Sequence, residues 1–177
     1  DQGYRFIDCP GYLFVEAVSQ AQQMYEDLMI VIIDDALASG IGANTVAVTF
    51  RENEAGFLAG VATALKLGEG EVGFVGGLEI PAVQKFNWGF QQGITYVNEN
   101  LGTNITMNEN NFVYSGSFAD LALGQQLATA MYDSGVDAIF AAAGGTGVGV
   151  INEAKNRRLS GEDVWAIGVD VDQYTVG

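Results

Sequence analysis

The stretch Ala141-Ala-Ala-Gly-Gly-Thr-Gly-Val-Gly-Val150 decides the fold class of this chain. It follows the apolar run Asp137–Ala141 and precedes an amphipathic segment, so we expect a strand, a glycine-rich turn and a helix from about Gly147 to Arg158. In a parallel sheet, such a turn brings backbone N–H groups and a helix N-terminus toward a ligand at the carboxyl end of the strand. The sequence therefore favours an α/β protein that binds a ligand at the edge of a parallel sheet where the strands end.

The glycines of this stretch match neither of the two common phosphate-binding motifs. With Gly145 and Gly147 as the first two glycines of the dinucleotide fingerprint, the third position is Val150. No Gly-Lys-Ser/Thr follows, as a P-loop requires. The glycines could hold a polar ligand by their amides, or they could serve only a tight turn with close helix–sheet packing.

Three other loops in the second half also follow apolar runs, at Gly76–Glu79, Ser115–Phe118 and Asp170–Gln173. From residue 71 onward the pattern is β-α-β-α-β-α-β with short turns, which predicts a doubly wound, right-handed parallel sheet. Parallel strands end at the same edge of a sheet, so all four loops should meet there. That edge is where we expect a ligand.

The first part of the chain looks like the tail of a similar unit. A short, strand-like apolar run at Tyr4–Ile7 comes first and an amphipathic helix follows it. The β-branched run Met29–Ile33 then predicts a buried strand, and Thr45–Phe50 predicts another. The short polar stretch Gly68–Glu71 is the expected boundary between two lobes. We therefore divide the chain into residues 1–68, the remainder of an N-terminal lobe, and residues 69–177, most of a C-terminal Rossmann-like lobe.

The helix expected to begin near Arg51 carries two overlapping patterns. One is a helical apolar stripe that predicts a buried face, formed by Phe57, Leu58, Val61 and Leu65. The other is the pair Gly56 and Gly60, four apart on one face, which suggests close packing against another element.

Both ends of the chain look cut. It begins at Asp1 without a Met or a signal peptide, and its last expected strand has no helix after it. We expect an internal segment of a longer protein, truncated at both ends.

Composition narrows the class of ligand. The formal charge is −15 with only seven Lys and Arg, so the basic footprint that nucleic-acid binding needs is absent and a neutral polar ligand fits better. The chain has no His, which excludes Ser-His-Asp and Cys-His nucleophile systems and His-ligated metal sites, and the single Cys9 cannot form an internal disulfide. No apolar run reaches the ~18 residues of a membrane span. We expect no catalytic residues, no metal and no cofactor.

Several side chains at the expected edge could bind a ligand, and each has a simpler alternative. Phe118 could stack on a planar base, or it could be a loop aromatic packed onto the core. Asp170 could accept hydrogen bonds from vicinal hydroxyls, or it could cap a helix or sit in a solvated turn. Asp34 occupies the same place in the first half, with the same alternative. Adjacent residues of an extended segment point opposite ways, so Asp34 and Asp35 should not share a ligand.

Five motifs in the right order make the chain similar to a known family. They are Val48-Thr-Phe-Arg-Glu-Asn-Glu-Ala-Gly-Phe-Leu-Ala-Gly60, Val72-Gly-Phe-Val-Gly-Gly77, Lys85-Phe-Asn-Trp-Gly-Phe90, Ala142-Ala-Gly-Gly-Thr-Gly147 and Trp165-Ala-Ile-Gly-Val-Asp170. Together they resemble the basic membrane lipoprotein family, the PnrA/TmpC-type purine nucleoside receptors that are substrate-binding components of ABC transporters. The resemblance runs from about Gly11 to the last residue.

The resemblance implies a periplasmic-binding-protein type I-like fold, in which two lobes of doubly wound parallel sheets close on a nucleoside such as guanosine, inosine or adenosine. It implies a protein anchored outside the cytoplasmic membrane, in the periplasm or at the cell surface, by a lipidated Cys outside this segment, with an ABC permease as partner. By motif match, Phe118 would be one of two aromatics that sandwich the purine. Gly144 would give backbone contacts, Asp170 would bind the ribose hydroxyls, and Asp34 would be the matching aspartate of the N-terminal lobe.

The chain departs from the family pattern at both ends. The first βα unit, which carries an Asp-Asn pair and the second stacking aromatic, is absent, as is the segment after residue 177 that supplies a Lys near the ligand. Three alternatives remain open: a binding protein for a sugar or another neutral solute, the effector domain of a transcription regulator, and a nucleotide-dependent enzyme. The missing fingerprint and the missing His count against the enzyme.

Overall fold

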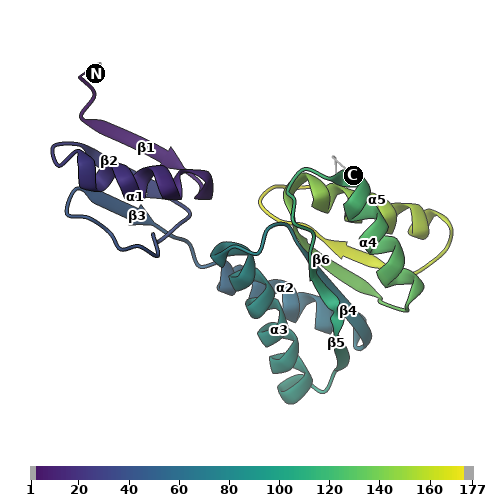
Figure 1. The fold of residues 1–177 in the computed structure, drawn as a ribbon. Coiled ribbons are helices and arrows are strands. Elements are labelled where there is room, and N and C mark those ends of the chain that lie inside the picture. The colour runs from purple at the N-terminus through teal and green to yellow at the C-terminus, as the bar shows by residue number, and fades with distance from the viewer. Residues whose placement is uncertain (1–2, 174–177) are drawn as a thin grey trace. The chain divides into compact units, whose positions relative to one another are not determined.

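The computed structural model describes residues 3–173, and the chain forms two compact α/β units, Asp1–Arg51 and Glu52–Gly177 (Figure 1). Both units contain an all-parallel sheet, as the sequence predicts. The division by contacts falls before helix α2 (Glu52–Leu67), whereas the predicted lobe boundary follows it at Gly68–Glu71. The difference arises because α2 packs against helix α3 (Pro81–Leu101) of the second unit.

The first unit is a three-stranded parallel sheet with one helix. Its elements are β1 (Phe6–Pro10), the 3-10 helix η1 (Tyr12–Phe14), α1 (Val15–Met24), β2 (Met29–Ile33) and β3 (Thr45–Val48), with the strands in the order β1-β2-β3. The strand predicted at Met29–Ile33 is confirmed. A small core holds the unit together, formed by the buried side chains of Cys9, Val18, Ile30, Ile32 and Leu37.

The second unit alternates helices and parallel strands. After α2 and α3 its elements are α4 (Leu121–Asp133) and α5 (Gly144–Leu159), with β4 (Glu69–Gly76), β5 (Asn104–Tyr114), β6 (Ala138–Ala142) and β7 (Trp165–Ile167) as strands in the order β5-β4-β6-β7. The predicted βα series from residue 71 is confirmed. Pro81 is the first residue of α3, where its missing N–H breaks no helical hydrogen bond.

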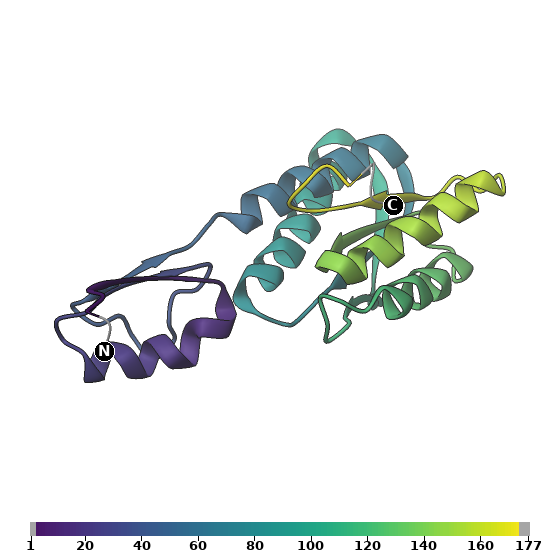
Figure 2. The ribbon, with the colours of Figure 1, turned by 90° about the horizontal axis from the view of Figure 1, so that it is seen from above.

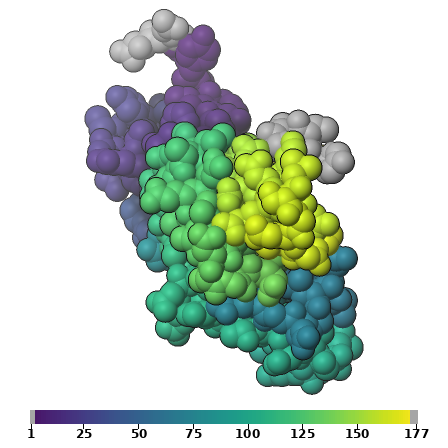
Figure 3. All heavy atoms as spheres, turned by 90° about the vertical axis from the view of Figure 1, so that its right-hand side faces the viewer, coloured from purple at the N-terminus to yellow at the C-terminus, as the bar shows by residue number. Residues whose placement is uncertain are grey.

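Helices cover both faces of this sheet. Figures 1 and 2 show α2 and α3 on one face and α4 and α5 on the other, and Figure 3 shows α4 (green) beside α5 (yellow) on the surface. Successive strand residues alternate between the two layers. Phe74 and Phe140 pack toward α2 and α3, with Phe90 of α3 in the same cluster, while Val75 and Ile139 pack toward α4 and α5.

Glycines form the contact face of α2, and of the predicted apolar stripe Val61 packs against the core. Leu58 and Leu65 are 66% and 55% exposed. The buried face instead contains Gly56 and Gly60, as their spacing suggests. A Cβ on Gly60 would collide with the carbonyl oxygen of Phe90 in α3, so the two backbones touch. A Cβ on Gly89 or Gly93 of α3 would likewise collide with the carbonyl oxygen of Asn53 or Phe57 in α2.

An ion-pair network joins α4 to α5. The Arg157 guanidinium, whose side chain is only 14% exposed, bonds Glu153 at 2.8 Å, Asp133 at 2.6 Å and Glu162 at 3.1 Å. Burial raises the pKa of the Glu153 carboxyl, but hydrogen bonds from Arg157 and Gln125 outweigh burial, so the net pKa lies below its ordinary value. Hydrogen bonds to Asp133 and Glu153 raise the pKa of Arg157, which stays charged.

The α2–α3 contact predicts effects of different size for two neighbouring substitutions. Gly60→Ala should destabilise the second unit by about 1–3 kcal/mol, because the added methyl group forces the helices apart. Leu58→Ala should change stability by less than about 0.5 kcal/mol, because the side chain is exposed. Both tryptophans of the chain, Trp88 and Trp165, lie in this unit, so urea unfolding followed by tryptophan fluorescence reports on it. Equal effects of the two substitutions would contradict the glycine contact.

The Glu153 carboxylate predicts a pH dependence of stability. A carboxyl whose folded pKa is depressed stabilises the fold above its ordinary pKa of 4.5, and that stabilisation is lost as the pH falls through the folded pKa. Glu153→Gln should therefore cost about 1–3 kcal/mol at pH 7, and the difference from the wild type should shrink as the pH falls below 4.5. The control is Asp163→Asn, which removes the exposed pair of Asp163 with Arg158 and should have little effect at any pH. A Glu153→Gln cost that stays constant down to pH 3 would count against this role.

Candidate ligand-binding site

The carboxyl ends of the four parallel strands of the second unit meet at one edge, as predicted. The strands end at Gly76, Tyr114, Ala142 and Ile167. The Gly77 N–H donates to the Ala142 carbonyl at 3.0 Å, and the Gly116 N–H donates to the Gly77 carbonyl at 3.0 Å. The loops after β4, β5 and β6 are thus connected by their own backbones.

The glycine-rich stretch after β6 differs from the predicted turn. Helix α5 begins at Gly144 rather than Gly147, so these glycines form the first helical turn. The Gly145 N–H donates to the Phe118 carbonyl at 2.8 Å, and the Thr146 N–H donates to the same oxygen at 3.4 Å. Two amides at the start of α5 therefore bind the chain's own carbonyl. An anion at this helix N-terminus would have to displace the Phe118 oxygen.

Phe118 and Gly144, both predicted site residues, are brought together at this edge. Phe118 is half-buried and packs on the margin of the core beneath α2 and α3. Its ring lies against Gly77, where a Cβ would collide with it. A Cβ on Gly144 would lie 3.5 Å from the Phe118 Cβ. The ring therefore packs partly on the core and keeps the rest of its surface exposed.

Asp34 and Asp170, the two predicted aspartates, share an unusual backbone conformation. Asp34 directly follows β2 in the first unit and has a φ of 75°, and Asp170 lies in the loop after β7 with a φ of 68°. Among residues 3–173, only these two and Leu37 are non-glycine residues with positive φ. Both aspartates are exposed. Such a conformation costs free energy and is found at functional sites when the surroundings enforce it.

Local hydrogen bonds hold the loops that carry these aspartates. The Asp35 carboxylate accepts from the Leu37 N–H at 2.7 Å, so it serves a turn instead of a ligand shared with Asp34. In the second unit, the Gln173 side-chain oxygen accepts from the Val169 N–H at 2.9 Å. Gln173 was not among the predicted site residues, because no spacing or motif marks a side chain that bonds a nearby backbone.

The sequence of the whole chain, residues 1–177, matches the family model for the PnrA-like ABC transporter substrate-binding proteins, called Bmp. The chain belongs to this family.

Curated relatives of this Bmp chain share more than a third of its residues. The CD4+ T-cell-stimulating antigen of Listeria monocytogenes is 37% identical over 98% of the chain and 47% of the relative. The ABC transporter nucleoside-binding protein BmpA of Lactococcus lactis is 35% identical over 99% of the chain and 48% of the relative. The chain thus spans about half the length of the curated relatives it matches.

Solved structures place the Bmp chain in the periplasmic-binding-protein fold class. A solute-binding protein of an ABC transporter system from Aeropyrum pernix superposes with a TM-score of 0.82 at 30% identity, over 96% of the chain and 47% of that protein. GanP, a glucose-galactose binding protein from Geobacillus stearothermophilus, superposes with a TM-score of 0.73 at 19% identity, over 97% of the chain and 59% of that protein. At that identity the second likeness concerns the fold alone.

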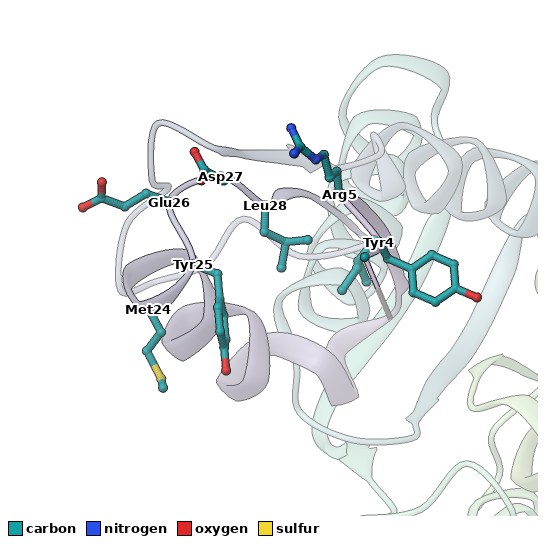
Figure 4. Close-up of a pocket in the computed structure, with 9 residues that line it drawn as sticks. Tyr4, Arg5, Met24, Tyr25, Glu26, Asp27 and Leu28 are labelled. Carbon is teal, nitrogen blue, oxygen red and sulfur yellow. The ribbon is translucent and has the colours of Figure 1, made fainter. Parts of the chain in front are cut away.

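Two hollows of this Bmp chain lie away from the strand ends. One, of about 930 Å³, lies in the first unit at the amino ends of β1 and β2, with Tyr4 and Arg5 on one side and Met24 and Tyr25 on the other (Figure 4). The other, of about 210 Å³, lies in the second unit between α2 and strand β7. Ligands of parallel α/β sheets bind at the carboxyl ends of the strands, so neither hollow is the candidate site. Within residues 3–173, no helix has the length and apolarity to cross a membrane.

Proposed function

We propose that this chain forms part of a receptor that captures purine nucleosides for an ABC importer and performs no chemistry on them. The observation that carries the proposal is the placement of Phe118, Gly144 and Asp170 at one sheet edge, with Asp34 at the corresponding strand end of the first unit. Membership of the PnrA-like family supports it, as does the name of the Lactococcus relative, a nucleoside-binding protein.

Each residue has a role that suits a nucleoside. Phe118 offers an aromatic surface on which a purine base can stack. The exposed Asp170 carboxylate has two oxygens that can accept hydrogen bonds from the two ribose hydroxyls. Gly144 contributes backbone contacts to the same ligand. A ligand without hydroxyls would leave a carboxylate without its hydrogen bonds, which penalises free bases.

The electrostatics favour a neutral ligand over a nucleotide. The Phe118 carbonyl already accepts hydrogen bonds from two backbone N–H groups at the start of α5, where a phosphate would otherwise bind. The chain also carries a net charge of −15, which repels anions. The same features disfavour a nucleotide-dependent enzyme.

Membership of the family supports a proposal about the location and the partner of the protein. We propose that the protein works outside the cytoplasmic membrane, in the periplasm or at the cell surface, held there by a lipidated cysteine outside this segment. From there it would deliver the nucleoside to the ABC permease.

Two substitutions test the assigned residues. In the full-length protein, Phe118→Ala and Asp170→Ala should each weaken nucleoside affinity at least about tenfold, or about 1.4 kcal/mol, because they remove the stacking surface and the hydroxyl acceptor. Phe57→Ala and Asp163→Asn are the matched controls, since these residues lie on α2 and in the loop before β7 and should leave affinity unchanged. Isothermal titration gives the affinities, and titration curves that Phe118→Ala and Asp170→Ala leave unaltered would overturn the site.

A ligand panel tests the nucleoside itself. The full-length protein should bind at least one of guanosine, inosine and adenosine, and should bind ribose, adenine and the nucleoside monophosphates much more weakly. Binding of ribose or glucose in preference to every nucleoside would move the assignment to a sugar receptor. Catalytic turnover of any of these compounds would favour the alternative hypothesis of an enzyme.

A further inference from the structure

We propose that Thr146 is a positioning residue that fixes Phe118 at the ligand-binding edge. The inference goes beyond the residues assigned above. Its consequence for affinity rests on the proposed nucleoside function, whereas its consequence for the position of Phe118 does not.

The Thr146 hydroxyl bonds the chain on both sides of Phe118. Thr146 is fully buried, with 0% exposure. Its Oγ1 donates to the Ser117 carbonyl at 3.0 Å and accepts from the Asp120 N–H at 2.9 Å. A hydroxyl can donate and accept at once, which is what these two partners require.

The backbone beside Thr146 holds Phe118 itself. The Phe118 carbonyl accepts from the Gly145 N–H at 2.8 Å and from the Thr146 N–H at 3.4 Å. Residues 117, 118 and 120 are therefore all bonded to the first turn of α5. We call this set of four hydrogen bonds the Thr146 clamp.

Rigid elements support the clamp. A Cβ on Gly124 of α4 would collide with the Thr146 carbonyl, so the two helices touch at this point and the start of α5 has no room to move toward α4. Asp120 is also the N-cap of α4 and accepts from the Leu123 N–H at 2.9 Å. The short loop that carries Phe118 thus runs between two anchored helix ends.

The consequence of the clamp is a preorganised aromatic. With its backbone bonded to α5 and its ring against Gly77, Phe118 does not need to be ordered when a ligand arrives. Ordering a loop side chain during binding costs affinity, so a fixed ring binds more tightly than a mobile one. Loss of the Thr146 hydroxyl would leave the Ser117 carbonyl and the Asp120 N–H without this partner and release the loop.

The first experiment measures the position of Phe118 without any ligand. Thr146→Val removes the hydroxyl at nearly constant shape, and Thr146→Ser keeps it. The matched control is Thr63→Val, since Thr63 is also buried but its hydroxyl bonds only the Ala59 carbonyl of its own helix. The Gly145 amide reports on the Phe118 carbonyl, so Thr146→Val should raise its hydrogen-exchange rate at least about tenfold, while the other two variants should not. Unchanged exchange at Gly145 would overturn the proposal.

The second experiment is a double-mutant cycle on affinity in the full-length protein, with guanosine, inosine and adenosine as probes. Thr146→Val should weaken binding about tenfold in the wild-type background, and less than about twofold when Phe118 is already Ala, because the clamp then has no ring to position. Thr146→Ser should restore affinity to within about threefold of wild type. An equal loss in both backgrounds would show that Thr146 does not act through Phe118 and would overturn the proposal.

The two experiments separate the two hypotheses. If the wild type binds none of the nucleosides, the proposed function fails, and the exchange rate at Gly145 alone decides whether Thr146 positions Phe118. If nucleosides bind, but neither hydrogen exchange at Gly145 nor the double-mutant cycle links Thr146 to Phe118, the proposed function stands and the proposed role of Thr146 fails.

Discussion

The burial of strands β4 and β6 on both faces constrains everything else in the second unit. Every residue of β6 is buried, as are the last five residues of β4. Parallel strands of this kind need helices on both sides, and the connections between the strands supply them. Because each connection brings the chain back to the opposite edge of the sheet, all four strands run in the same direction. The loops after β4, β5, β6 and β7 therefore all begin at one edge. The edge that carries Phe118 and Gly144 is therefore a consequence of burying residues such as Phe74 and Ile139.

The sequence predicted the secondary structure correctly wherever the hydrophobic periodicity matches the burial of the side chains. The apolar runs predicted the strands of both units, and the alternation of runs and amphipathic segments predicted the parallel topology. On α2 the apolar stripe was wrong for Leu58 and Leu65, which are exposed, whereas the spacing of Gly56 and Gly60 correctly predicted close packing. At these two glycines α2 lies so close to α3 that no side chain fits between the helices. Hydrophobic periodicity does not detect a contact made by backbone atoms.

The candidate site was predictable in outline but not in its hydrogen bonding. Phe118 and Gly144 could be placed at one edge from the order of strands and loops, and they do meet there. The helix start at Gly144 was missed because glycine is typical of turns and the chain carbonyl that accepts the first amides comes from Phe118, far away in sequence. Thr146 was missed for the same reason, because only the folded chain brings Ser117 within its reach. Gln173 bonds the nearby Val169 N–H, and no motif marks such a contact.

The two aspartates show why a residue type, and not only a backbone shape, must be explained. Glycine adopts a positive φ without steric cost, most other residues pay about 1–2 kcal/mol for it, and aspartate tolerates it better than most because its side chain can bond locally. Asp34 and Asp170 hold that conformation at the carboxyl ends of strands in different units, and both are exposed. The backbone conformation alone does not require a carboxylate at either place, which is consistent with the binding role proposed for both aspartates. At the start of α5, by contrast, the Phe118 carbonyl accepts the helix amides, and the chain itself fills the position of an anion. An exposed carboxylate at the strand ends, together with a helix end that the chain itself closes, suits a ligand with hydroxyl donors and no charge.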